Sequence, residues 1–288
     1  MGGGFATPSL DEPCVPVLLR ATDVEADLRR LGIRASRGLG QHFLIDERVA
    51  RRQVERASIQ EGETVLEVGP GLGVLTRILG TRARRVIAIE KDRRLADALR
   101  ALGGPIEVVH GDALKVEWPA FDVMVSNLPY RISSPVTFRL LDRPFDRAVL
   151  MFQREFAERL IARPGTKDYS RLTVNVAHRA ECEILERVPR SAFHPQPRVD
   201  SAIVRLVRRA PAYHAMDETS FHAVVDATFL HRRKTIANAL RLEWRRFDTD
   251  RDRWRETLLS LPFLDRRAGD LSPAEFATLA NGIAGAKG

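Results

Sequence analysis

The stretch TVLEVGPGLG at residues 64–73 decides the fold. Residues 64–68 form a short run of apolar and β-branched residues, which predicts a buried strand. Gly69, Gly71 and Gly73 follow, before a pattern of apolar residues typical of a helix. A glycine turn between strand and helix lets the backbone approach a ligand at the carboxyl edge of a parallel sheet, although many tight turns also use glycine. The G-x-G-x-G spacing differs from the G-x-G-x-x-G of dinucleotide-binding proteins and disfavours an NAD-dependent dehydrogenase.

Further apolar runs continue this alternation of strand and helix along the chain. They lie at residues 85–89, 106–109, 121–126, 147–152, 183–188 and 201–207. Strands that alternate with helices pair in parallel through right-handed crossovers, and continuously apolar strands fit a sheet covered on both faces. After Pro211 the apolar residues recur at helical spacing. We therefore expect an α/β protein with a Rossmann-like, mostly parallel seven-stranded sheet and a small C-terminal helical domain.

The length of the chain allows two domains. Its 288 residues are 44% hydrophobic and 29% charged, which is ordinary for a globular protein. We expect an N-terminal extension at residues 1–36 with a short helix over 23–31, a first domain at 37–210 and a helical domain at 211–288. No apolar run reaches the about 18 residues that a membrane helix needs, and the first residues do not resemble a secretory signal.

The charge of the chain points to a polyanionic partner. The net charge of +8 favours RNA or DNA, although the excess can also be plain surface charge. Arg232, Arg233 and Lys234 form the clearest basic cluster, and on a helix they could contact phosphates or simply face solvent. Cys14 and Cys182 suggest neither a disulfide framework nor a zinc site, which fits the cytoplasm, and no metal is expected.

Two carboxylates follow the strands next to the glycine turn. Glu90 ends the second strand, where a carboxylate can accept hydrogen bonds from both ribose hydroxyls of an adenosine group. Asp112 follows the third strand and can accept a hydrogen bond from the adenine amine of the same ligand. Each also has a structural alternative, as a charge at a helix N-terminus for Glu90 and as a cap for Asp112. Together with the glycine turn they favour a ligand that contains adenosine.

The residues Asn127-Leu128-Pro129-Tyr130 directly follow the fourth strand. An exocyclic adenine nitrogen is a poor nucleophile, because its lone pair is delocalised into the ring. Two acceptors, the Asn127 side chain and the Leu128 carbonyl, could draw it toward tetrahedral geometry on a turn fixed by Pro129. Tyr130 and Phe193 could stack on the two faces of a base taken out of its helix. The alternatives are a proline turn capped by asparagine and, for Phe193, a core residue.

Taken together, six ordered motifs resemble the KsgA-type family of ribosomal RNA adenine dimethyltransferases. They occupy residues 39–44, 67–73, 127–130, 169–172, 193–197 and 232–235. Residues 165–169 resemble archaeal and eukaryotic members more than bacterial ones. The resemblance implies a class I methyltransferase domain that binds S-adenosylmethionine, with a small helical domain that contacts RNA. It offers no counterpart for the extension before Gly38.

The resemblance also implies the residues of the donor site and the substrate. The expected cofactor-binding positions are Gln41, His42, Leu44, Gly69, Gly71, Gly73, Glu90, Asp112, Ala113 and Asn127. The expected substrate is a pair of adjacent adenosines in the 3′-terminal hairpin of small-subunit ribosomal RNA, within an immature small subunit, and we expect a monomer. Two alternatives stay open: a ribosome-assembly factor without catalysis on the same scaffold, and adenine methylation of large-subunit RNA or of DNA.

Overall fold

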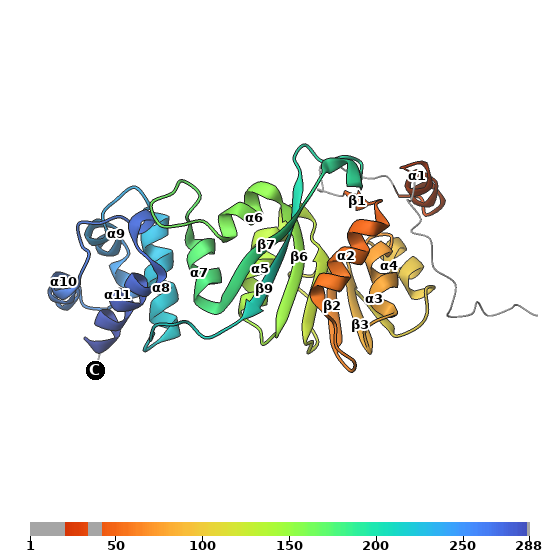
Figure 1. Ribbon diagram of the computed structural model, residues 1–288. Coiled ribbons are helices and arrows are strands. Elements are labelled where there is room, and N and C mark those ends of the chain that lie inside the picture. The colour runs from red at the N-terminus through yellow and green to blue at the C-terminus, as the bar shows by residue number, and fades with distance from the viewer. Residues whose placement is uncertain (1–20, 34–41, 287–288) are drawn as a thin grey trace, which may run out of the picture.

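A seven-stranded sheet forms the centre of the protein in the computed structural model, which describes residues 21–33 and 42–286 (Figure 1). Its strands are β2 (Thr64–Val68), β3 (Arg85–Glu90), β4 (Ile106–His110), β5 (Val123–Asn127), β6 (Arg147–Gln153), β7 (Ala180–Val188) and β9 (Ser201–Arg208). They lie in the order β4-β3-β2-β5-β6-β9-β7. Strand β9 is antiparallel to β6 and β7, and the remaining neighbours pair in parallel. The predicted mostly parallel seven-stranded sheet is therefore confirmed.

Helices cover both faces of this sheet, which explains why its strands read as continuous apolar runs. Leu66 faces one apolar core and its neighbour Val65 faces the other. The first core is closed by α5 (Ser133–Leu141), α6 (Arg154–Leu160) and α7 (Arg171–Arg179), and the second by α2 (Glu47–Ala57) and α3 (Val74–Gly80). A further helix, α4 (Arg93–Arg100), packs beside β3 and β4.

The C-terminal part of the chain is helical, as the sequence predicts. Its helices are α8 (Glu218–Leu230), α9 (Ile236–Leu242), α10 (Arg251–Ser260) and α11 (Pro273–Gly285). They enclose an apolar core of their own, which also takes in Tyr169 and Val174 from the preceding part of the chain. The Tyr169 hydroxyl donates a hydrogen bond to the Leu271 carbonyl at 2.7 Å. This buried contact ties the loop before α7 to the helices that follow residue 217.

Two small elements complete the upper edge of the molecule in Figure 1. The expected N-terminal helix is present as α1 (Ala21–Arg30), and its residues Val24 and Leu28 pack against Phe43 and Leu95. Strand β1 (Phe43–Leu44) pairs antiparallel with β8 (Phe193–His194), although about 150 residues separate them in sequence. Within the described ranges, no helix combines the length and apolarity that crossing a membrane requires.

Candidate active site

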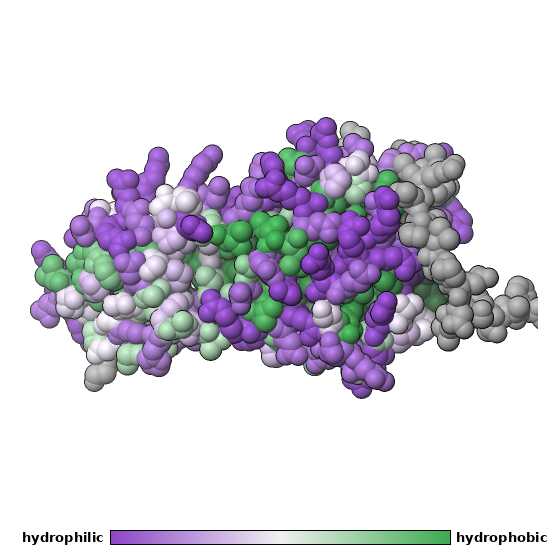
Figure 2. Space-filling model, in the orientation of Figure 1, coloured by the Kyte–Doolittle hydropathy of each residue, from purple (hydrophilic) through white to green (hydrophobic). Residues whose placement is uncertain are grey.

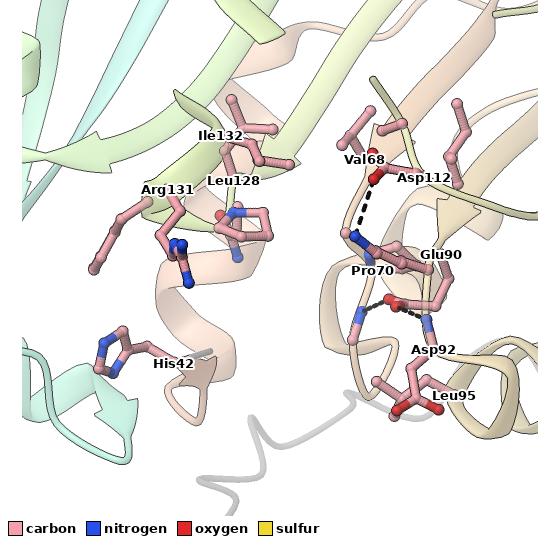
Figure 3. Close-up of a pocket in the computed structure, with 18 of the residues that line it drawn as sticks. His42, Val68, Pro70, Glu90, Asp92, Leu95, Asp112, Leu128, Arg131 and Ile132 are labelled. Carbon is pink, nitrogen blue, oxygen red and sulfur yellow. Dashed lines mark hydrogen bonds and ion pairs between the residues drawn. The ribbon is translucent and has the colours of Figure 1, made fainter. Parts of the chain in front are cut away.

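A cavity of about 680 Å³ opens at the carboxyl ends of the parallel strands. Figure 3 shows two facing groups of side chains: His42, Leu128, Arg131 and Ile132 on one wall, and a group around Glu90 on the other. The glycine turn, the end of β3 and the end of β5 all line this one space. The sequence motifs of a donor site and of an acceptor site therefore meet in a single cavity.

The glycine turn allows close contacts on both of its sides. Gly69, Gly71 and Gly73 have φ values of +73°, +58° and +78°, which side chains rarely adopt. A Cβ on Gly69 would lie 2.9 Å from Pro129, and one on Gly71 would lie 3.1 Å from Phe43. Gly69 and Gly71 line the cavity. Gly73 does not line the cavity. A Cβ there would meet Leu99 of α4 and Leu102 just after it, so this glycine allows close packing against that helix.

Glu90 is held rigidly at the carboxyl end of β3. One carboxylate oxygen accepts a hydrogen bond from the Gly71 amide at 3.2 Å, and the other accepts one from the Asp92 amide at 2.8 Å (Figure 3). Burial raises the pKa of Glu90, and the amide hydrogen bonds oppose that shift. Each oxygen keeps a lone pair for a further donor, so the carboxylate can bind two hydroxyl groups of a ligand.

Asp112 lines the same wall with Ala113. Its Oδ1 accepts a hydrogen bond from the Leu114 amide at 3.0 Å, and its Oδ2 pairs with Lys91 Nζ at 2.9 Å. The Leu114 amide and then Lys91 lower the pKa of Asp112, so the group is a carboxylate at neutral pH. Lys91 was not identified from the sequence, although its position directly after β3 is a usable signal.

Asn127 ends β5 on the opposite wall. Its side-chain Oδ1 is buried and has no hydrogen-bond partner among the residues that the structure describes. Leaving a buried acceptor unpaired costs about 1–3 kcal/mol, so a ligand donor at this place would recover free energy. Leu128 and Pro129 also line the cavity, and a 3-10 turn over Tyr130–Ile132 begins after Pro129. The predicted acceptor turn therefore lines the cavity, and Asn127 holds one buried acceptor without a partner among the described residues.

Aromatic residues and a histidine close this wall. The Tyr130 hydroxyl and Ser201 Oγ lie 2.7 Å apart, and the Tyr130 ring centroid is 5.4 Å from that of His42. His42 Nδ1 lies 2.6 Å from the Pro195 carbonyl and must donate its hydrogen there, because a carbonyl oxygen can only accept. Phe193 is 4% exposed and packs in the second core, yet it also lines the cavity. Phe193 is therefore both a core residue and a cavity residue, and its stacking on a base stays a prediction.

Other predicted site residues lie elsewhere. Leu44 is buried in the second core and does not line the cavity, and Gln41 lies outside the described residues. Arg232, Arg233 and Lys234 are in a turn between α8 and α9, so the expectation that they lie on a helix is wrong. The next helix begins only after Thr235, whose side chain caps it by accepting a hydrogen bond from the backbone amide three residues further along.

Several cavity residues carry no sequence motif. They are Lys91, Asp92, Leu95, Leu114, Arg131, Ile132 and Met151. Only Lys91 and Asp92 directly follow a strand, and for these two that position is a signal that could have found them.

Comparison with known proteins agrees with this geometry. The family model described as "Ribosomal RNA adenine dimethylase" matches residues 33–251. A Thermococcus kodakarensis protein named "Probable ribosomal RNA small subunit methyltransferase A" is 48% identical over 252 residues, which cover 85% of this chain and 89% of that protein. A protein of the same name from Methanopyrus kandleri is 45% identical, with 94% of this chain and 100% of that protein covered. That match must reach into residues 1–36, for which the sequence motifs offered no counterpart.

Two solved structures are similar over most of the chain. A dimethyladenosine transferase from Plasmodium falciparum has a TM-score of 0.71 and 31% identity, with 83% of this chain and 96% of that chain covered. The 23S rRNA methyltransferase ErmE has a TM-score of 0.60 and 33% identity, with 84% of this chain and 99% of that chain covered.

Proposed function

Because the chain belongs to the ribosomal RNA adenine dimethylase family, we propose that it dimethylates N6 of two adjacent adenosines in the 3′-terminal hairpin of small-subunit ribosomal RNA. The KsgA-type resemblance seen in the sequence is thereby confirmed. Relatives named for the small subunit are 42–48% identical to this chain, whereas the large-subunit enzyme ErmE is 33% identical. That difference favours the small subunit over the large one as the substrate.

The donor wall fits S-adenosylmethionine, which supplies a methyl group carried on a sulfonium. Glu90 offers two acceptor positions for ribose hydroxyls, and it is fixed by two backbone amides. Asp112 offers a carboxylate for the adenine amine, and its pairing with Lys91 keeps it ionised. Gly69 and Gly71 leave room for the ligand against their backbone. These residues bind and orient the donor.

The acceptor wall fits an adenine amine, and the unpaired Oδ1 of Asn127 is the observation that carries the proposal. This oxygen accepts one N6 hydrogen and the Leu128 carbonyl accepts the other, which localises the lone pair on nitrogen for attack. Tyr130 and Phe193 hold the base between them. The methylated amine is cationic and acidic enough to lose its proton to water, so no side chain is required as a strong base.

Membership of the family indicates that ribosomal RNA is the substrate. We place the reaction on an immature small ribosomal subunit in the cytoplasm, with a monomeric enzyme that contributes to subunit biogenesis. Arg232, Arg233 and Lys234 lie outside the cavity, and Arg233 and Lys234 are exposed. The negatively charged sugar-phosphate backbone of RNA is the partner that suits such a basic cluster.

The proposal is tested with small subunits that lack the modification and S-adenosylmethionine labelled on its methyl group. We expect N6,N6-dimethyladenosine in the 3′-terminal hairpin, detected by mass spectrometry. Asn127→Ala should lower the transfer rate by about a hundredfold or more, because an acceptor aimed at the reacting amine is removed, while RNA binding stays largely intact. Asn281→Ala serves as a control, because that side chain bonds Met216 and His214 in the helical part.

Three results would contradict the proposal in different ways. Full activity of Asn127→Ala would remove Asn127 from the reaction. Methylation of large-subunit RNA alone would favour an activity like that of the 23S rRNA methyltransferase ErmE. Tight binding to small subunits without any methyl transfer would favour an assembly factor that has lost catalysis.

A further inference from the structure

Strands β2 and β5 stop pairing before either of them ends. Their pairing is confined to Val65 with Val123 and Leu66 with Met124. On the outer sides, β2 stays paired with β3 through Val68, and β5 stays paired with β6 to its last residue. The chain leaves β2 toward one edge of the sheet and β5 toward the other, and ligand crevices form at such points. The gap between these two strand ends lies beneath the cavity.

One buried polar side chain spans this gap, and a second holds β5 and β6 beside it. Ser126 Oγ accepts a hydrogen bond from the Val68 amide at 2.9 Å, where a ladder bond between the strands is missing. Gln53 reaches in from α2, and its amide nitrogen donates to the Ser126 carbonyl at 3.2 Å and to the Val149 carbonyl at 3.1 Å. Gln53 and Ser126 are both 0% exposed. They therefore connect β2, β5 and β6 one residue before Asn127.

A glutamine at position 53 carries a free-energy cost that an apolar side chain in the same place would not carry. Its Oε1 is buried and has no partner among the described residues. An unpaired buried amide oxygen destabilises the fold, whereas an apolar side chain of the same shape would avoid that cost. The unpaired Oε1 therefore offsets part of the stability that the two donated bonds contribute, so these bonds stabilise the fold little overall.

We propose that Gln53 and Ser126 are positioning residues for methyl transfer. They fix the carboxyl end of β5, and so direct Asn127 Oδ1 into the cavity although the ladder with β2 has ended. The inference rests on the proposed function, because it deepens the role of the Asn127 turn. Neither Gln53 nor Ser126 lines the cavity.

The test compares two substitutions on α2. Gln53→Met keeps the length of the side chain and removes both donated bonds, whereas Val54→Ala removes packing from a residue that is 4% exposed in the same core. For Gln53→Met we expect kcat for methyl transfer to fall about tenfold, because small displacements of reacting groups are costly. Its KM for S-adenosylmethionine should change less than twofold, and its Tm should stay equal or rise. For Val54→Ala we expect a lower Tm and an unchanged kcat.

Amide hydrogen exchange gives a second measurement that needs no activity. Peptides covering residues 124–128 should exchange faster in Gln53→Met than in the unmodified protein, and Val54→Ala should not show this local change. The inference is overturned by normal kcat and normal exchange in Gln53→Met, and equally by decreases in rate that follow Tm in both variants. Failure of the unmodified protein to methylate small subunits would instead overturn the proposed function, and the exchange data would still decide the inference.

Discussion

Glu90 accepts a hydrogen bond from a backbone amide on each of its two carboxylate oxygens. A glutamine side chain has only one oxygen and cannot accept both bonds in this way. In Glu90→Gln one of the two positions becomes an NH2 group that faces an amide hydrogen, and the charge is removed. We expect the affinity for S-adenosylmethionine to fall about ten- to a hundredfold, which corresponds to about 1.5–3 kcal/mol for hydrogen bonds to a charged group. Titration calorimetry measures this, and Glu107→Gln on the neighbouring strand is the exposed control. Equal affinities of the two variants would remove Glu90 from the donor site.

Glu67 shows a different use of a buried carboxyl, directly before the glycine turn. Burial raises the pKa of Glu67 from 4.5 to about 8, and its Oε2 has no partner among the described residues. The folded protein thus holds this proton more tightly than the unfolded chain does. The contribution of protonated Glu67 to the free energy of unfolding is therefore fully present at low pH. It is lost as pH rises from about 4.5 to about 8.

Glu67→Gln removes this titration, because an amide does not ionise. We expect the variant and the unmodified protein to have similar Tm values near pH 5. The variant should become the more stable one as pH approaches 8, by on the order of 3 kcal/mol. Thermal unfolding of both proteins across this range measures the difference. A difference that does not change with pH would show that Glu67 is ionised in the fold at every pH tested.

The helices and strands differ in how well the sequence predicts them. The central strands were predicted because helices cover both faces of the sheet, so each strand is a continuous apolar run that is visible without any partner. The ends were less accurate: one strand begins at Val123 rather than at residue 121, and another at Ala180 rather than at 183. Strand ends depend on which neighbour pairs last, and single-sequence patterns do not contain that information.

The short elements at the rim of the cavity were the least predictable. Strands β1 and β8 have two residues each and pair across the whole methyltransferase fold, so neither has a periodic pattern. The short helix α1 was predicted, but its packing on Phe43 and Leu95 was not. Both of these residues line the cavity, so α1 forms an outer support of the donor site. The roles of Gln53 and Lys91 likewise arise from tertiary contacts alone.

At the scale of the whole molecule, one face combines both parts of the chain. The loop between α6 and α7 and the loop between α8 and α9 lie at the upper edge in Figure 1, the edge that also carries β1. Arg232 donates to the Thr166 carbonyl at 3.1 Å, and the Gly165 amide donates to the Gly269 carbonyl at 2.7 Å. Figure 2 shows hydrophilic side chains projecting from this edge. Arg232 therefore connects the two loops, and Gly165 connects the first loop to the turn before α11.

This surface carries basic side chains that the protein does not neutralise. Arg163 and Lys167 in the first loop, and Arg233 and Lys234 in the second, are exposed. Within residues 21–33 and 42–286, none of these four side chains makes an ion pair that would neutralise it. If RNA phosphates bind here, they contact both loops, and the first loop belongs to the methyltransferase part of the chain. The RNA-contacting residues would then extend beyond the Arg-Arg-Lys cluster.

The double variant Arg163→Glu/Lys167→Glu tests this extension, because the sequence motifs assign no RNA binding to its loop. We expect weaker binding to small subunits and a shallower dependence of log K on log salt, by about 0.7 for each phosphate that is no longer bound. Arg56→Glu/Arg82→Glu makes the same change of net charge near the amino ends of the strands, away from the cavity. If charge acts only through the overall field, the two double variants will bind equally. If the loop binds phosphate, only the first variant will show the weaker salt dependence, and both will bind S-adenosylmethionine normally because neither touches the cavity.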